Sequence, residues 1–297
     1  MSDAGAGGRA QKPDWPQEVW ETLSQAERDA AYNNNRAVRN STTLIRERDA
    51  LAAAYRAANP SGLDIPYGTA PRMAFDLFPA SDPAAPCLVF IHGGYWQRNS
   101  RESFAHYAEG LRAAGWSVAM PGYSLAPDAT LGEIVAEIGA ALDWLGREGP
   151  KHGVAGPIVV SGWSAGGHLA AMALGHPAVD AGLAISGVYD LGPIRDTFLN
   201  APLGLTDDEI ATLSPLRLPP VPKPLAIAYG TAELPALVRD SERLSEIRAV
   251  GGAPGALILI DGADHFTILD EFRSAHGALT RAAQDILAQA LAARAAA

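Results

Sequence analysis

The chain has 297 residues, of which 48% are hydrophobic and 19% charged, a composition typical of a globular protein with a substantial core. Its formal net charge of −10 argues against nucleic acid or an anionic membrane as a partner, because both attract a basic surface. One cysteine, Cys87, excludes an internal disulfide framework and a multi-cysteine metal site. There is no run of about 18 apolar residues and no apolar signal-peptide core. We therefore expect a cytoplasmic protein.

The N-terminal part of the sequence predicts helices only. Residues 1–12 are small and polar and predict a disordered tail, and residues 13–60 predict a helical arm. Ser24 followed by Glu27 predicts a capping box. Three residues are expected to share one face of the helix predicted over 43–58: Leu44, Leu51 and Tyr55. Because this arm precedes every predicted strand, it either packs outside the sheet or reaches over the site as a lid.

From residue 73 onward, predicted strands alternate with predicted helices. The first strand, 73–78, alternates with period two and should be partly exposed. Apolar strands are predicted at 87–91, 117–120, 158–160, 182–186, 225–229 and 256–260. Helices are predicted at 104–114, at 131–145 and from about 275 to the end. This order predicts an α/β fold with a mostly parallel, doubly wound sheet and helices on both faces, forming a single domain over 13–297.

The interval 190–220 has no predicted strand and contains five prolines. We interpret it as a small cap that passes over the site, together with the N-terminal arm. The site itself belongs at the carboxyl ends of the parallel strands.

The strongest chemical signal is Gly162-Trp-Ser164-Ala-Gly166. It lies between an apolar strand and an alanine-rich helix, so it predicts a sharp turn with a serine at its apex. Glycine is needed on both sides because a Cβ there would collide with the neighbouring chain. The pattern indicates a nucleophile elbow, in which the Ala165 N–H points at the group that Ser164 attacks.

A serine hydroxyl needs a base, and the base needs a carboxylate that holds its tautomer. His265 is the best candidate among seven histidines, because it lies just past the last predicted strand. Glu233 is the first carboxylate after the preceding strand and is our choice for the acid, with Asp240 as second choice. The order Ser, acid, His is the one found in α/β-hydrolases.

Acyl transfer also needs N–H groups that stabilise a developing oxyanion. His92-Gly93-Gly94 follows a buried strand, and its glycines would let the backbone turn its amides toward a ligand. We predict an oxyanion hole formed by Gly93, Gly94 and Ala165. His92 is interpreted as a structural residue that anchors this loop. We predict no cofactor and no metal, because the sequence has no HExxH motif, no dinucleotide-binding motif and no Walker-type loop.

Five segments of the sequence resemble the α/β-hydrolase superfamily: HGGYW at 92–96, PGYSLAP at 121–127, GWSAGGH at 162–168, YGTAELP at 229–235 and DGADHF at 261–266. Within it, the chain resembles the HGG-type esterases related to hormone-sensitive lipase, and more finely the arylformamidase (kynurenine formamidase) group. The finer match includes Arg239-Asp-Ser241, Asn200 with Ser214-Pro215, and a looser match at 32–36. The resemblance covers about residues 65–275. Two positions depart from the group's pattern: Glu233 replaces aspartate, and Asp240 stands where glutamine is expected.

The resemblance implies a serine hydrolase that cleaves a small formyl or acyl group from an aryl amide or ester. It implies Ser164 as nucleophile, His265 as base and Glu233 as the acid. Aromatic residues expected to line the substrate pocket are Tyr95, Trp96, Phe198 and Phe266. A carboxylesterase for short-chain acyl esters is the main alternative, and a non-catalytic ligand-binding protein on the same fold is a remote one. We expect a small-molecule substrate as partner, and a homodimer is left open.

Overall fold

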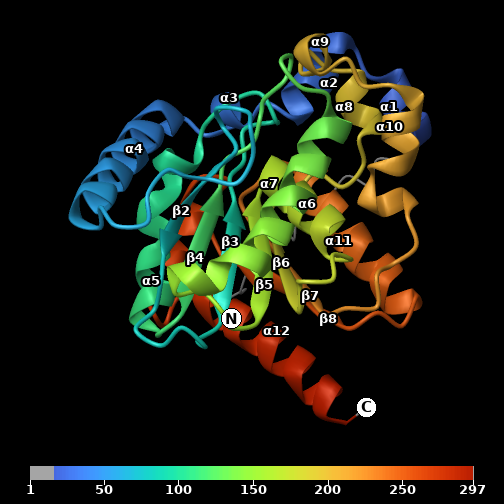
Figure 1. Cartoon of the computed structure of the whole chain (residues 1–297). Coiled ribbons are helices and arrows are strands. Elements are labelled where there is room, and N and C mark those ends of the chain that lie inside the picture. The colour runs from blue at the N-terminus through green and yellow to red at the C-terminus, as the bar shows by residue number, and fades with distance from the viewer. Residues whose placement is uncertain (1–16, 297) are drawn as a thin grey trace, which may run out of the picture.

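The computed structural model describes residues 17–296 of the protein. A central sheet runs through this part of the chain (Figure 1). Its strands are β1 (Ile65–Pro66), β2 (Ala74–Phe78), β3 (Cys87–Ile91), β4 (Ser117–Pro121), β5 (Ile158–Trp163), β6 (Ala181–Ile185), β7 (Leu225–Gly230) and β8 (Gly255–Ile260). Their order is β1-β2-β4-β3-β5-β6-β7-β8. The pairs from β4 through β8 are parallel, whereas β2 is antiparallel to both β1 and β4. The predicted mostly parallel sheet is thereby confirmed. The tail predicted over 1–12 lies outside the described residues.

Helices cover both faces of the sheet, as predicted. One face packs against α6 (Leu131–Glu148), α7 (Ala165–Ala173) and α11 (Pro235–Val250). The other packs against η1 (Arg101–Ala108), α5 (Glu109–Ala113), η4 (Thr267–Phe272) and α12 (Ala278–Ala295). A short 3-10 turn, η2 (Gly149–His152), follows α6. Neighbouring residues of one strand enter opposite cores, which explains why β3 and β5 are buried at every position.

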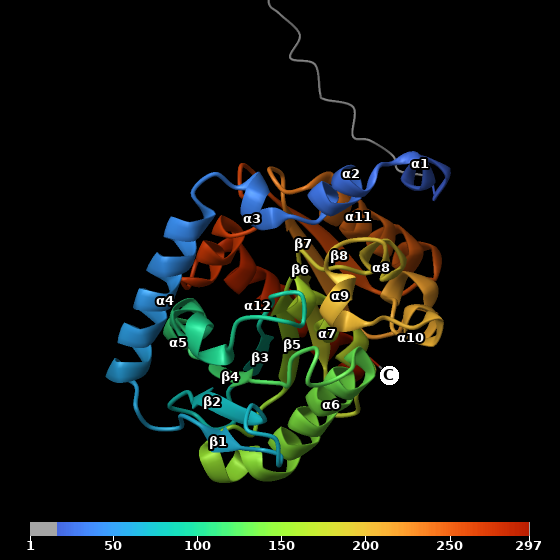
Figure 2. The same ribbon diagram turned by 90° about the horizontal axis from the view of Figure 1, so that it is seen from above.

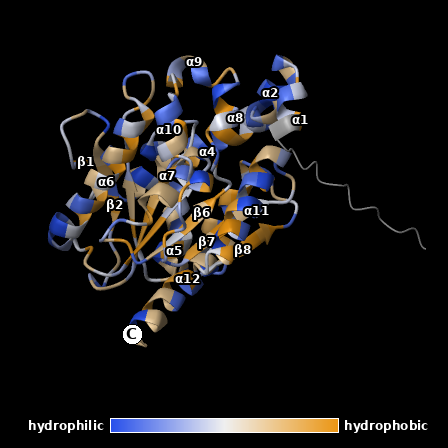
Figure 3. Cartoon of the chain, turned by 90° about the vertical axis from the view of Figure 1, so that its right-hand side faces the viewer, coloured by the Kyte–Doolittle hydropathy of each residue, from blue (hydrophilic) through white to orange (hydrophobic). Residues whose placement is uncertain are grey.

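Coloured by hydropathy, the chain shows hydrophobic residues concentrated on β6, β7 and β8 (Figure 3). The last of these is the edge strand, and Leu259 on it is exposed. In the part of the chain that the structure describes, no helix has the length and apolarity needed to cross a bilayer.

Strand β2 is buried at all five positions, so its predicted partial exposure is wrong. The reason is Asp76, the polar residue that produced the alternating pattern. Its carboxylate pairs with Arg56 Nε at 2.9 Å and with Arg101 Nε at 3.1 Å. Arg56 from α4 (Ser41–Ala58) and Arg101 from η1 thus compensate a charge on a fully buried strand.

The N-terminal arm forms α1 (Gln17–Thr22), α2 (Gln25–Ala31), α3 (Asn34–Ala37) and α4 (Ser41–Ala58). The predicted capping box of Ser24 and Glu27 is confirmed at α2. On α4, Leu44 and Leu51 line one cavity and Tyr55 packs on Phe78, although Leu51 is exposed. The most buried residues of this helix are Ser41, Arg48 and Ala52. The helix packs on η1, where the Arg48 guanidinium lies 4.4 Å from the centre of the Phe104 ring.

The interval predicted as a cap contains only short helices: α8 (Gly192–Arg195), α9 (Asn200–Leu203), α10 (Asp207–Thr212) and η3 (Pro215–Arg217). Seen from above, α4 lies on one side of the molecule and α8–α10 on the other, with α2 and α3 between them along the rim (Figure 2). Trp20 Nε1 donates to Asp196 Oδ2 at 2.9 Å, and the Phe198 N–H donates to Asp29 Oδ1 at 2.8 Å. The arm and the cap are therefore joined to each other.

Candidate active site

Ser164 occupies a strained turn between β5 and α7. Its φ of 60° and ψ of −121° are rare for a residue with a side chain. A Cβ on Gly162 would collide with the Gly166 carbonyl, and one on Gly166 would collide with the Ile91 carbonyl. The strand–turn–helix geometry of an elbow is therefore present, with Ser164 at its apex.

Three side chains from separate loops form a continuous hydrogen-bonded line. The His265 ring lies with Nε2 3.1 Å from Ser164 Oγ and Nδ1 2.8 Å from Glu233 Oε2. Glu233 follows β7 and His265 follows β8, so both are at the sheet edge where Ser164 lies. All three are at least nine-tenths buried. Since a carboxylate only accepts, Nδ1 carries the proton in this pair and Nε2 is free to accept the serine hydroxyl's proton.

The carboxylate of Glu233 is also held from its other oxygen. Oε1 accepts from the Gly230 N–H at 2.9 Å and from the Ser186 hydroxyl at 2.5 Å. Ser186 directly follows β6 and has a φ of 49°. Ser186 was not among the predicted site residues. Its one signal was its position at the end of the strand that pairs with β7.

Trp163, the residue before the serine, fixes the histidine loop. Its Nε1 donates to the His265 carbonyl at 2.8 Å, and the two rings lie 4.7 Å apart between centroids. One residue therefore links the elbow to the loop that carries the base.

Asp240, the second choice for the acid, is occupied elsewhere. Its carboxylate accepts from the Tyr189 N–H at 3.0 Å and from the Asp190 N–H at 3.2 Å, and it pairs with Arg239 at 3.0 Å. Burial raises the pKa of this carboxyl above its usual value. Within residues 17–296 it makes no hydrogen bond to His265.

The loop after β3 runs directly beside the elbow. A Cβ on Gly93 would lie 2.9 Å from that of Ser164, so only glycine fits there. Gly94, Tyr95 and Trp96 all have positive φ, at 125°, 52° and 58°. This backbone turns sharply around the space above Ser164, next to the first turn of α7 that begins at Ala165.

His92 lies beneath this loop as a buried, neutral side chain. Its Nδ1–H donates to the Gly93 carbonyl at 2.9 Å, and its ring stacks on Tyr123 at 4.3 Å. Burial lowers its pKa to about 3. These contacts agree with an anchoring role for His92.

A cavity of about 330 Å³ opens onto Ser164 and His265. Tyr95, Phe198 and Phe266 line it, as predicted. Trp96 does not line it; this prediction is wrong. The Trp96 ring is fully buried instead, with its edge against His168 at 5.0 Å between centroids. Tyr95 and Trp96 both have positive φ; the Tyr95 side chain borders the cavity, whereas the Trp96 ring enters the core.

The N-terminal arm supplies part of the cavity wall through Asn33, Asn34, Asn35 and Arg48. The Tyr95 hydroxyl joins the arm to the loop after β3. It donates to the Tyr32 carbonyl at 2.6 Å and accepts from Asn34 Nδ2 at 3.0 Å. Of the two placements expected for the arm, packing outside the sheet is seen in α4, which lies on η1. Residues 32–35 of the arm also line the cavity.

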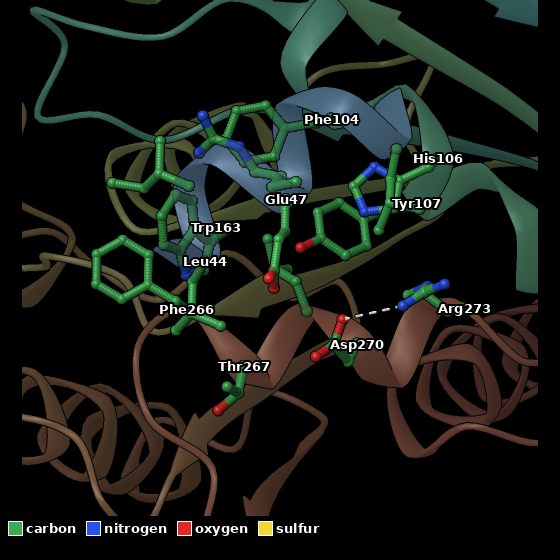
Figure 4. Close-up of a pocket in the computed structure, with 14 residues that line it drawn as sticks. Leu44, Glu47, Phe104, His106, Tyr107, Trp163, Phe266, Thr267, Asp270 and Arg273 are labelled. Atoms are coloured by element: carbon green, nitrogen blue, oxygen red, sulfur yellow. Dashed lines mark ion pairs between the residues drawn. The ribbon is translucent and has the colours of Figure 1, made fainter. Parts of the chain in front are cut away.

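A second, smaller cavity of about 100 Å³ adjoins the first between α4, η1 and η4 (Figure 4). The two cavities share four lining residues: Ile45, Arg48, Trp163 and Phe266. His106 and Tyr107 line the smaller cavity, and an ion pair joins Asp270 to Arg273 at 3.9 Å. Among the described residues, no three histidine, cysteine or acidic side chains are grouped as metal ligands would be.

Comparison with known proteins gives consistent relatives. Residues 76–180 match the BD-FAE family. Kynurenine formamidase from Danio rerio is 25% identical over 287 residues, covering 88% of this chain and 96% of its own. A protein from Silicibacter sp., solved as a candidate thioesterase, has a TM-score of 0.79 and 28% identity and covers 87% of this chain and 99% of its own. A thermostable carboxylesterase cloned from a metagenomic library has a TM-score of 0.67 and 21% identity, over 83% of this chain and 96% of its own.

The last of these similarities concerns the fold alone, whereas the Danio rerio protein is an enzyme by name and the Silicibacter protein a candidate one. The similarities agree with the open, mostly parallel sheet. The chain is therefore a hydrolase with the α/β-hydrolase fold, related to the arylformamidases and esterases.

Proposed function

We propose that the protein is a serine hydrolase that removes a formyl or other small acyl group from an aryl amide, as the kynurenine formamidases do by name. The observation that carries the proposal is the line Ser164–His265–Glu233, with hydrogen-bond distances of 3.1 and 2.8 Å. In this proposal Ser164 is the nucleophile, His265 the general base and acid, and Glu233 the group that orients the imidazole.

The reaction follows from this arrangement. His265 Nε2 takes the serine proton as Oγ attacks the carbonyl carbon, and Glu233 stabilises the imidazolium that forms. The oxyanion is held by backbone N–H groups of Gly93, Gly94 and Ala165. When the tetrahedral intermediate collapses, the imidazolium gives its proton to the leaving nitrogen. Water then attacks the acyl-enzyme with His265 again as base, and formate or another small acid leaves.

Ester hydrolysis is the second candidate, because the same groups act on an ester and the Silicibacter relative was solved as a candidate thioesterase. The two candidates differ only in the leaving atom, which is nitrogen in an amide, oxygen in an ester and sulfur in a thioester. They separate when kcat/KM is compared for N-formyl-kynurenine and p-nitrophenyl acetate.

Two variants make this comparison decisive. Ser164→Ala should abolish turnover of both substrates, by about 10⁶ in comparable triad enzymes. Ser161→Ala is the matched control, because it removes a buried hydroxyl on β5, the strand that leads into the elbow, and this hydroxyl donates to the Leu183 carbonyl. A preference for the formyl anilide supports the amidase, and ester turnover alone supports the esterase. Turnover by Ser164→Ala at the wild-type rate would refute the assignment of Ser164 as the nucleophile.

A further inference from the structure

The side chain of Asn99 lies against the loop that follows β3. Its Nδ2 donates to the Gly93 carbonyl at 3.1 Å. The same atom lies beside Gly94, where an added Cβ would be only 2.8 Å from it. Asn99 has a φ of 67°, in the left-handed region, which asparagine adopts more readily than most other residues with a side chain. The Asn99 amide thus contacts both glycines of the loop.

The Gly93 carbonyl has two donors. His92 Nδ1 donates to it at 2.9 Å and Asn99 Nδ2 at 3.1 Å. The peptide bond after Gly93 is planar and trans, so its carbonyl and the Gly94 N–H lie in one plane and point in opposite directions. Hydrogen bonds that fix the Gly93 carbonyl therefore also fix the direction of the Gly94 N–H. Within residues 17–296 this N–H has no acceptor, so it is available to a substrate oxygen.

Two arginines hold Asn99 in turn. Arg48 Nη2 donates to Asn99 Oδ1 at 3.4 Å, and Arg72 Nη2 donates to the Asn99 carbonyl at 2.6 Å. Because a guanidinium only donates, Arg48 faces the amide oxygen and Nδ2 is left to face the Gly93 carbonyl. Arg48 is itself buried and pairs with Asp49 at 2.7 Å. One orientation of the Asn99 amide therefore satisfies both of its ends.

We propose that Asn99 is a positioning residue for the reaction, whose amide holds the Gly93–Gly94 peptide plane so that the Gly94 N–H points at the oxyanion. This role rests on the proposed function. The oxyanion gains its charge in the transition state, so the alignment of its donors affects kcat more than KM. His92 still holds the Gly93 carbonyl when Asn99 is changed, so the loss should be smaller than the factor of about 10²–10³ for removing a donor.

Asn99→Gly removes the amide and keeps the backbone, because glycine adopts a φ of 67° without strain. It should lower kcat about tenfold and leave KM within about twofold, on the better of N-formyl-kynurenine and p-nitrophenyl acetate. Asn99→Asp keeps the volume and replaces the donor with an acceptor, and it should lose at least as much. The matched control is Asn59→Gly, which removes a half-buried amide that donates to the Tyr55 carbonyl at 2.9 Å, at the end of α4. It should keep the wild-type kcat.

Phenylboronic acid tests the same geometry without turnover. Its boron bonds to Ser164 Oγ while the serine proton passes to His265 Nε2, which leaves a tetrahedral, negatively charged boronate where the oxyanion would form. Calorimetry should show binding weakened about tenfold in Asn99→Gly and unchanged in Asn59→Gly. Ser164→Ala gives the binding that remains without the covalent bond.

The outcomes separate the two proposals. Wild-type binding no tighter than that of Ser164→Ala would refute the reactive serine, and with it both the proposed function and the role of Asn99. Binding that depends on Ser164 but is unchanged by Asn99→Gly and Asn99→Asp would overturn the role of Asn99 alone. A loss confined to KM would also overturn it, because Asn99 would then act on the bound substrate rather than on the oxyanion.

Discussion

The hydroxyl of Ser186 donates to Oε1 of Glu233 at 2.5 Å, while Oε2 of the same carboxylate lies 2.8 Å from His265 Nδ1. The carboxylate is thus fixed from both oxygens, by β6 on one side and by the histidine loop on the other. Glutamate has one methylene more than aspartate, and fixing both of its oxygens limits the additional freedom that this methylene brings.

Ser186→Ala should lower kcat/KM by about tenfold, because the carboxylate loses a charge-assisted hydrogen bond that fixes its orientation. Steady-state kinetics with the better substrate measures this. Ser161→Ala provides the comparison, since its hydroxyl is equally buried but does not contact Glu233. Equal losses in both variants would mean that Ser186 acts only through general packing.

Glu233→Gln should reduce kcat by about 10⁴, because an amide no longer favours the tautomer with the proton on Nδ1. Asp240→Asn should leave kcat within a few-fold of the wild type. It should instead cost about 2 kcal/mol in the free energy of unfolding, since Arg239 and two backbone N–H groups lose their charged partner. Kinetics and urea denaturation on both variants measure the two quantities. The opposite pattern would transfer the acid's role to Asp240.

Tyr95→Phe should loosen the contact between the arm and the loop after β3. The variant loses a bond to the Tyr32 carbonyl and one from Asn34, worth about 1 kcal/mol each. Amide hydrogen exchange should become faster over residues 32–37. Tyr67→Phe is a suitable control, because it removes a buried hydroxyl bond to the Gly122 carbonyl, away from the arm. Unchanged exchange in Tyr95→Phe would show that other contacts hold the arm.

Stability should fall below about pH 6.5. Burial lowers the pKa of His92 to about 3, and those of His106 and His168 to about 4. Between these values and 6.5 the unfolded chain binds protons that the folded chain does not, so acidification favours unfolding. Each such histidine contributes roughly 1 kcal/mol per pH unit well below 6.5. Asp240, whose pKa burial raises, acts in the opposite direction.

Urea denaturation at pH 7, 6 and 5 measures this dependence, and His106→Asn should make it less steep. His106 suits the test because it lines the smaller cavity and lies outside the proposed catalytic groups. A free energy of unfolding that stays constant from pH 7 to pH 5 would contradict the expected proton uptake.

Local patterns predicted much of the fold and the central part of the site. The apolar run before Ser164 and the two glycines around it contained enough information to place the elbow. The collision that requires glycine is local at Gly162, with the Gly166 carbonyl, whereas the one at Gly166 is with Ile91 of β3. Glu233 and His265 could be chosen from their places after predicted strands, because parallel strands end at one edge of the sheet.

Features that depend on distant partners could not be predicted. Asp76 gave β2 the pattern of a half-exposed strand, because nothing nearby in the sequence indicates that Arg56 and Arg101 pair with its carboxylate. Trp96 was assigned to the cavity because nothing near it in the sequence indicates that its ring packs against His168 in the core. The cavity residues of the arm and the support from Ser186 likewise depend on contacts across the fold.

The contact between the arm and the cap has a consequence for biosynthesis. Trp20 and Asp196 are separated by 176 positions, so the arm is translated long before its partner exists. The sheet to which the site belongs is also completed late, since β7 and β8 follow the cap. A nascent chain can form α4 early, because helices need only local contacts. The wall of the cavity can close only when the ribosome has nearly finished, so a truncated product would have the serine without the enclosure around it.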